Sequence, residues 1–457
     1  MDTSSTNQSS SNKPGSAGTG LGVIFLTVFV DLVGFSIIFP LFPQLLDHYL
    51  ALEGDASFIG GIVSMLDAAT GGGPGARTYT IVLFGGLLGS LYSVLQFFSA
   101  PLWGRLSDRH GRRRILQITS LGVAISYAVW FFSGNFMLLV LSRLIGGAMS
   151  GNISVATAAV ADVTSSENRS KGMGMLGAAF GLGFLLGPAV GGGLATLFNP
   201  LIDTSVVDLS GIPGINPFSM AALGAFIMAS INFVWIFLRF KETLPEGGST
   251  ASSQRPINPL AFLKKVPFAG VNRINAVYFI YLFAFTGMEF TLTFLARERF
   301  QYTAGQNVYL FIFIGFIIAT VQGGIVRRVT PKYGEKKIIL FGMFLLIPGM
   351  SILGAATTEF AMYLGLGILA VGSALATPTL TALVSLYTPS DRQGEILGTF
   401  RSLGALARAV GPIVACGVYW RFGSGWPYFG AAIITLLPLA IALGLPAPEP
   451  PEKAPEE

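Results

Sequence analysis

The chain has 457 residues, of which 52% are hydrophobic and only 11% are charged, and its mean hydropathy is +0.66. This composition excludes an ordinary soluble domain and indicates an integral membrane protein that crosses the bilayer several times. The net charge of +5 does not indicate a nucleic-acid ligand, because the basic residues lie on alternate loops and not on one face.

Twelve apolar segments of membrane-spanning length lie between two polar ends. They are expected at about residues 20–46, 79–103, 115–134, 136–161, 171–198, 218–240, 273–296, 305–328, 336–356, 359–386, 395–420 and 425–446. Residues 1–19 and 447–457 are polar or rich in Pro and Glu and are expected to be disordered. The polar, proline-containing stretch 241–272 is expected to link two halves, residues 20–240 and 273–446.

Loops rich in Lys and Arg alternate with loops that lack them. Five arginines lie between Arg105 and Arg114, in what is expected to be a short loop, and five basic residues lie within residues 327–337. Residues 199–217 hold none. Because cytoplasmic loops carry the excess of basic residues, both termini are expected on the cytoplasmic side of the plasma (inner) membrane.

Gly104, Asp108, Gly111 and Arg112 give the first basic loop a distinctive pattern. In order and spacing they resemble the loop between helices 2 and 3 of the major facilitator superfamily. The resemblance implies an all-α integral membrane fold, with twelve transmembrane helices in two pseudo-symmetric six-helix halves. By the same resemblance, Asp108 and Arg112 are expected to form a charge network with Asp162 that holds one conformational state closed.

An internal repeat relates the two halves. Gly187-Pro188 recurs as Gly411-Pro412, and Gly111 recurs as Gly334 at nearly the same offset. Such a constant offset indicates duplication of a six-helix unit.

Two charged residues fall inside the first four apolar segments. Asp31 lies about ten residues into the first segment, or roughly 15 Å at 1.5 Å per residue, which places it near the bilayer midplane. An acid at that depth is by default a proton or substrate site, although a structural carboxylate satisfied by a neighbouring helix is an alternative. Arg143 resembles the helix 4 arginine that the family links to proton coupling; its alternative is a packing role beside a carbonyl group.

The fifth segment contains the string Gly183, Gly187, Pro188, Gly191 and Gly192. Glycines four residues apart open a groove for a neighbouring helix, so general helix packing explains most of them. The whole string resembles the antiporter branch of the superfamily, which includes the bacterial tetracycline-efflux proteins, and it therefore favours export.

The second half adds Glu289 and Arg408, two further charged residues within apolar segments. With Arg401 included, the charged residues within the apolar segments carry more positive than negative charge. This excess does not favour a strictly cationic substrate. A central cavity is expected near the midplane, lined by the first, fourth, seventh and tenth helices. The polar side chains proposed to line it, each with packing as its alternative, are Gln96, Asn152, Tyr281 and Gln322.

The sequence offers no basis for an enzyme. It has no Walker lysine and no Cys/His metal spacing, and its one G-x-G-x-x-G string opens an apolar helix instead of following a strand. No cofactor or metal is expected, and the expected partners are a small-molecule substrate, protons and the bilayer, with the chain a monomer that binds no nucleic acid. The main functional prediction is a proton-coupled antiporter that exports a lipophilic or amphipathic molecule. The alternatives are a proton-coupled or facilitated carrier of a metabolite or organic anion, and a receptor without turnover.

Overall fold

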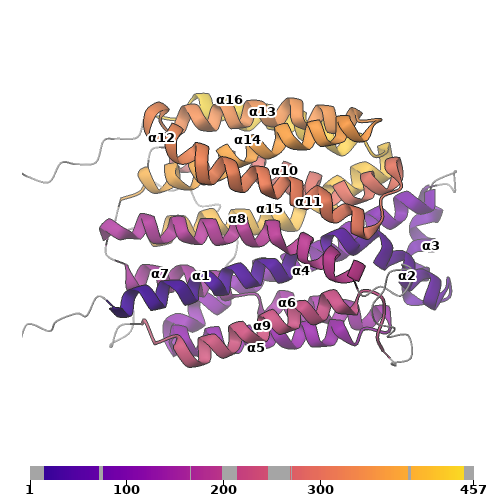
Figure 1. Ribbon diagram of the computed structural model, residues 1–457, viewed down its shortest axis with the longest axis horizontal. Helices are drawn as coiled ribbons and strands as arrows, with labels where there is room; N and C mark the ends of the chain where they lie inside the picture. The colour runs from indigo at the N-terminus through magenta and orange to yellow at the C-terminus, as the bar shows by residue number, and fades with distance from the viewer. Residues whose placement is uncertain are drawn as a thin grey trace, which may run out of the picture.

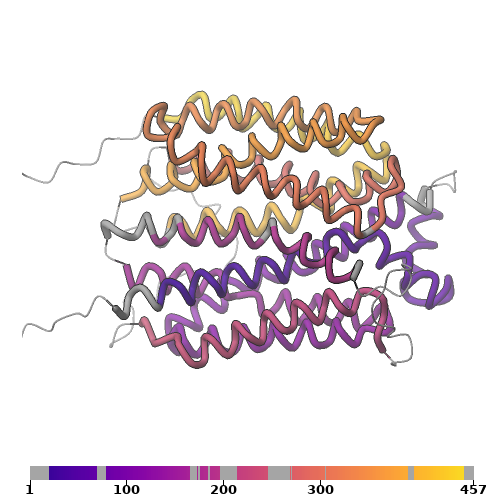
Figure 2. Tube along the Cα trace, in the orientation of Figure 1, coloured from indigo at the N-terminus to yellow at the C-terminus, as the bar shows by residue number. Residues whose placement is uncertain are grey.

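The computed structural model describes residues 15–70, 76–164, 166–197, 214–244, 268, 270–389 and 393–446, and every regular element in these ranges is helical. Figures 1 and 2 follow the chain from indigo to yellow. The first half contains α1 (Gly15–Ser36), η1 (Phe39–Leu41), α2 (Phe42–Glu53), α3 (Phe58–Thr70), α4 (Ala76–His110), α5 (Arg112–Phe131), α6 (Phe136–Met149), α7 (Asn152–Val163), α8 (Ser166–Leu197) and α9 (Ser219–Arg239). The second contains α10 (Val271–Phe300), α11 (Ala304–Thr320), η4 (Val321–Val326), α12 (Arg327–Tyr333), α13 (Glu335–Ala355), α14 (Glu359–Leu386), α15 (Gln393–Phe422) and α16 (Trp426–Leu443).

The described residues contain twelve spans long and apolar enough to cross a membrane, as the sequence predicted. Three spans are built from more than one element: α1 to α2, α6 with α7, and α11 to α12. Pro40 and Pro43 remove backbone donors in the first of these, so the helix tightens into the 3₁₀ turn η1. In Figure 1, α1–α9 and α10–α16 form two groups of helices that meet where α4 packs against α15 and α8 packs against α11.

Two expected loops are partly helical. The segment 104–114 was predicted to be a loop, but α4 continues to His110 and α5 begins at Arg112, so only Gly111 breaks the helix. Gly111 has φ +94°, and its repeat equivalent Gly334 has φ +79°, a backbone region that glycine occupies without strain. The loop after the first span also contains α3. Most of the predicted linker, residues 245–267 and 269, lies outside the described residues, as do residues 1–14 and 447–457 of the two tails.

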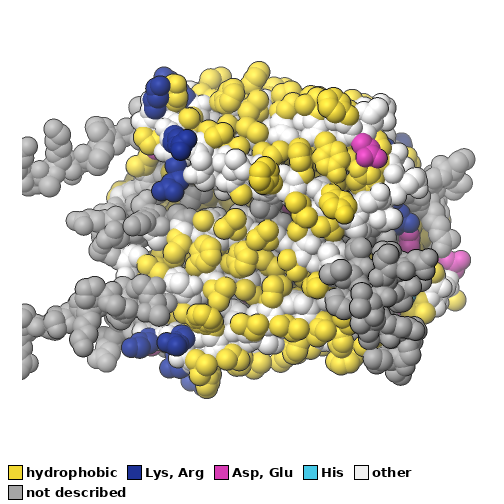
Figure 3. All heavy atoms as spheres, viewed as in Figure 1, with side chains coloured by type: hydrophobic (Ala, Val, Ile, Leu, Met, Phe, Trp, Pro, Cys, Tyr) yellow, Lys and Arg dark blue, Asp and Glu magenta, His cyan; other side chains and the backbone are white. Residues whose placement is uncertain are grey.

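The two ends of the bundle differ in charge. In Figure 3, Lys and Arg side chains gather at the left end, called here the basic end, which carries Arg105–Arg114 and Arg327–Lys337. Yellow apolar side chains cover the flank between the ends, and the large apolar side chains that are more than half exposed include Phe316, Phe344 and Phe360. Large apolar side chains exposed in such a belt are expected to face lipid.

The two halves touch at the end opposite the basic end. Asp47 of α2 forms an ion pair with Arg297 of α10, and the Gln44 amide donates to the Tyr302 carbonyl oxygen at 3.5 Å. Deeper in the bundle, the Phe290 ring lies 5.0 Å from the Phe42 ring, centroid to centroid. The interior of the bundle is therefore closed at this end.

Candidate functional site

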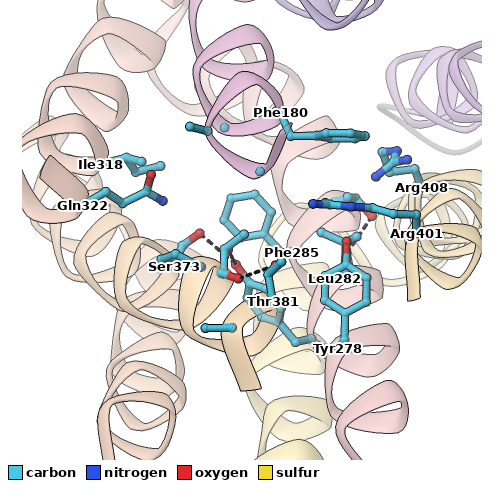
Figure 4. Close-up of a pocket in the computed structure, with 18 of the residues that line it drawn as sticks. Phe180, Tyr278, Leu282, Phe285, Ile318, Gln322, Ser373, Thr381, Arg401 and Arg408 are labelled. Atoms are coloured by element: carbon cyan, nitrogen blue, oxygen red, sulfur yellow. Dashed lines mark hydrogen bonds between the residues drawn. The ribbon is translucent and has the colours of Figure 1, made fainter. Parts of the chain in front are cut away.

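A cavity of about 600 Å³ lies between the two halves and is shown in Figure 4. Its walls come from α8 of the first half and from α10, α11, η4, α12, α14 and α15. The expected walls were the first, fourth, seventh and tenth spans, so only α10 and α14 agree with that prediction. No residue of the first span lines this cavity; its Phe39 and Phe42 pack against Phe290 of α10.

Two arginines on one face of α15 dominate the charge of the cavity. Arg401 and Arg408 are seven residues apart, which brings them to the same side of the helix, and Arg408 is only 8% exposed. Both guanidinium carbons lie over the Phe180 ring of α8, at 4.6 Å and 5.8 Å from its centroid. Such cation–π contacts stabilise a desolvated guanidinium without neutralising its charge.

Within the described part of the chain, no carboxylate lies within ion-pair distance of Arg401 or Arg408. Tyr278 of α10 is an electrostatic neighbour of Arg408. Glu289 of α10 lines the same cavity and interacts with Arg408 only over a longer distance. Its Oε2 is buried and has no hydrogen-bond partner among the described residues. The cavity therefore holds two guanidinium groups that no described carboxylate pairs with at ion-pair distance.

Hydroxyl and amide groups occupy another wall of the cavity. The Tyr281 hydroxyl is 2.8 Å from Ser373 Oγ and 2.9 Å from Thr377 Oγ1, so helices α10 and α14 share a small hydrogen-bonded cluster. Gln322 of η4 also lines the cavity. Tyr281 and Gln322 were predicted to line a cavity and do so. Gln96 and Asn152 lie outside it: the Gln96 amide donates to the Ser150 carbonyl oxygen, and Asn152 Oδ1 accepts from the Thr119 hydroxyl.

Asp31 and Arg143 belong to a separate buried cluster in the first half. Asp31 is 8% exposed and faces the Asn152 side chain, while Arg143 is 2% exposed and lies 4.7 Å over the Trp130 ring. Neither residue lines the cavity, and the two do not form an ion pair with each other. The structure thus separates the predicted proton-coupling pair from the arginine-lined cavity.

At the basic end, the structure brings Asp108, Arg112 and Asp162 together within the first half. Arg112 pairs with Asp108 and, at 2.9 Å through Nε, with Asp162. The Glu242 carboxylate accepts from the backbone nitrogens of Arg112 and Arg113 at 2.8 Å and 3.2 Å and caps the start of α5. Glu242 was missed because it is separated from Arg112 by 130 positions and lies in the stretch assigned to the linker.

The glycine string on α8 packs against α1. A Cβ on Gly183, Gly187 or Gly191 would lie 2.7, 2.5 or 1.9 Å from the carbonyl oxygens of Phe29, Val33 and Ile37, respectively. The three glycines recur every four positions, and so do the three residues whose carbonyl oxygens they approach. The two chain segments therefore pack closely along their length. Helix packing therefore accounts for these three glycines; Pro188 lies inside α8, and Gly192 is buried.

Comparison with known proteins identifies the family. The family model of the Major Facilitator Superfamily matches residues 24–347 and 325–457. The chain belongs to the major facilitator superfamily. Among relatives of this facilitator, major facilitator superfamily domain-containing protein 10 from Homo sapiens is 37% identical over 453 residues, covering 94% of each chain. Tetracycline resistance protein, class G, from Vibrio anguillarum is 29% identical, covering 92% of this chain and 96% of that protein.

A solved structure resembles this facilitator over nearly its whole length. The crystal structure of the human organic anion transporter MFSD10 (TETRAN) is 36% identical, with a TM-score of 0.74, and the match covers 94% of this chain and 100% of that one. The protein is therefore a multi-pass membrane transporter of the superfamily, and its substrate is a small molecule.

Proposed function

We propose that this facilitator transports amphipathic organic anions by alternating access, with Arg408 and Arg401 binding the anionic group of the substrate. The observation that carries the proposal is the pair of guanidinium groups in the cavity, which have Phe180 beneath them and no carboxylate within ion-pair distance among the described residues. Burying such groups without a counterion costs several kcal/mol, and a substrate carboxylate would offset that cost. The human relative described as an organic anion transporter supports the same substrate class.

The remaining walls of the cavity support an amphipathic substrate over a small inorganic anion. Phe285, Phe311, Ile314 and Ile318 line the cavity beside the arginines. Pockets that are mainly apolar, with a few convergent polar groups, suit drug-sized molecules. The arginines also disfavour lipophilic cations, and for that reason we place the anion carrier ahead of a drug-cation exporter.

The test is binding and flux of matched amphiphiles by the full-length protein in proteoliposomes. We expect an aryl carboxylate to bind and an equally large aryl ammonium ion not to bind. Arg408→Gln should weaken carboxylate binding by about 10- to 100-fold, as expected for loss of roughly 1.5–3 kcal/mol from a charged hydrogen bond. Arg421→Gln is the control, because Arg421 is an exposed arginine near the end of the same helix. Preference for the cation, or equal losses in both variants, would refute the proposal.

Proton-coupled export is a second candidate, favoured by a different observation. Asp31 and Arg143 are both buried in the first half and do not line the cavity, an arrangement that suits a proton site distinct from the substrate site. The tetracycline resistance relatives support the same function. Flux driven by an imposed pH gradient, with substrate leaving as protons enter, tests it. We further propose that the basic end faces the cytoplasm of a cell whose plasma membrane holds the protein.

A further inference from the structure

The cavity has polar groups at two separate places. Figure 4 shows Arg401 and Arg408 on one side, and Gln322 and Ser373 on the other. Phe285 and Leu282 lie between the two polar sides in the same view, and Ile318 lies next to Gln322. A molecule that fills the cavity therefore meets cations at one end, apolar side chains in its middle and neutral polar groups at the other end.

The neutral end retains unused hydrogen-bonding capacity. Tyr281, Ser373 and Thr377 have three hydroxyl hydrogens but share only two hydrogen bonds, so one hydrogen is left to donate. The Gln322 side chain has two amide hydrogens and a carbonyl oxygen, and it makes no hydrogen bond with the described residues. Gln322 is half-buried, and its Oε1 lies 3.7 Å from the position of a Cβ built on Gly181 of α8. Its amide thus extends from the second half towards the first.

The backbone around Gln322 is unusual. Val321–Val326 forms the π-helical turn η4, the only π-helix among the described elements, and such wide turns are frequent at functional sites. Gly323 and Gly324 follow Gln322, and a Cβ at either position would meet nothing within 4 Å. Close packing therefore does not explain these two glycines. Glycine is a poor helix former, so helix propensity does not explain them either. Val321 and Val326 at the ends of the turn pack into a small apolar cluster with Leu375, and between them the turn carries Gln322 on the cavity wall.

We propose that the cavity recognises both ends of its substrate, and that Gln322 is a specificity-determining residue for the uncharged end. The substrate class is then an amphipathic monoanion whose apolar body carries a distal hydroxyl, amide or carbonyl group. The anionic group binds Arg401 and Arg408, and the distal group binds Gln322 with the Tyr281 cluster. This inference rests on the proposed anion transport and adds the chemistry of the second end.

Arg327, five residues after Gln322 in the chain, is a third arginine in the cavity lining. It begins α12, is exposed and belongs to the basic end. Its charge is screened by solvent, so we assign it to attracting anions towards the mouth and not to binding the distal group. A dianionic ligand distinguishes the two roles.

The test compares three ligands of equal chain length: decanoate, 10-hydroxydecanoate and decanedioate. Binding to the full-length protein in nanodiscs is measured by calorimetry. For the wild type we expect 10-hydroxydecanoate to bind about tenfold more tightly than decanoate, the effect of one neutral hydrogen bond, and more tightly than decanedioate. Gln322→Met should reduce the tenfold preference to less than about twofold while decanoate affinity stays within about twofold.

Gln117→Met is the matched control, since Gln117 is half-buried on α5 and does not line the cavity. Tyr281→Phe removes one cavity hydroxyl oxygen and provides a second variant, which should also reduce the preference. Equal wild-type affinities for decanoate and 10-hydroxydecanoate, with Arg408→Gln weakening both, would overturn this inference and leave anion transport standing. Tightest binding of decanedioate would also overturn it and assign the distal end to Arg327. If no carboxylate binds while the folded protein binds an amphipathic cation, the proposed function fails with it.

Discussion

The Asp47 carboxylate on α2 and the Arg297 guanidinium on α10 form an ion pair that joins the two halves at the end remote from the basic loops. Both side chains remain more than a third exposed. Nearby, the Asn307 amide of α11 donates to the Pro40 carbonyl oxygen at 3.4 Å, and the Gln44 amide reaches the Tyr302 carbonyl. In alternating access, these contacts must break for the cavity to open at that end.

Breaking the Asp47–Arg297 pair should favour the state that is open at this end. Asp47→Asn removes one charge, and because exposed pairs contribute about 0–1 kcal/mol we expect up to about a fivefold rise in the open population. A cysteine placed at the buried Ser93, in a Cys416→Ala background, reports this opening by reaction with an impermeant maleimide. The double variant Asp47→Arg with Arg297→Asp exchanges the two charges and should restore the wild-type rate of maleimide labelling. Unchanged labelling in Asp47→Asn would show that the pair has no role in closure.

Glu289 should make anion binding depend on pH. When deprotonated, it attracts the same Arg408 guanidinium that binds the substrate and repels an incoming anion, so binding should weaken as pH rises. Glu289→Gln removes that charge, and we expect its affinity to be higher than wild type at alkaline pH and nearly independent of pH. Calorimetric titrations across a pH series measure both effects. A pH dependence that persists in Glu289→Gln would assign the titration to another group.

The close approach of α8 to α1 should make Gly191 intolerant of any side chain. Gly191→Ala places a methyl group against the Ile37 carbonyl oxygen, and we expect a loss of about 1–3 kcal/mol in stability. Gly193 lies two residues further on the same helix, and a Cβ added there would meet nothing within 4 Å, so Gly193→Ala should be neutral or slightly stabilising. Thermal unfolding in detergent compares the two. Equal melting temperatures would mean that the helices separate readily at this contact.

Asp31→Asn tests whether proton coupling is located away from the cavity. We expect the variant to keep wild-type affinity for the anion, because Asp31 does not line the cavity, and to lose flux driven by a pH gradient. Asp55→Asn, at an exposed carboxylate outside the spans, is the control. Gradient-driven flux that survives in Asp31→Asn would exclude the acid from coupling, and a large loss of affinity would place it at the substrate site.

The sequence predicted the membrane spans better than it predicted the cavity. Spans follow from hydropathy summed over about twenty residues, which tolerates errors of a few positions. The helical ending of α4 was missed because the polar residues between Gly104 and His110 suggested a loop, whereas the bonds of Arg112 to Asp108 and Asp162 satisfy these charges beside a helix. Only Gly111, with its positive φ, marks the actual break.

Which helices line the cavity depends on how side chains from both halves fill the interior, and hydropathy contains no such information. Tyr281 and Gln322 were found because polar residues in apolar segments are few. Gln96 satisfied the same criterion, but its amide donates to the Ser150 carbonyl oxygen in the break between α6 and α7. Phe180 was missed because phenylalanine is common in membrane helices. The sequence alone does not distinguish a phenylalanine that lines a cavity from one that contacts lipid or packs against another helix.

The contacts of Arg401 and Arg408 with the Phe180 ring leave their charge intact. At alkaline pH, where Glu289 is deprotonated, these three groups give the buried part of the empty cavity a net charge of +1, and a bound monoanion brings the sum to zero. A charge that moves through the membrane field exchanges about 2.3 kcal/mol per 100 mV. At alkaline pH, membrane voltage should therefore act on the return of the empty carrier and leave the loaded step almost unaffected, so the cell's electrical potential would set how fast the transporter resets.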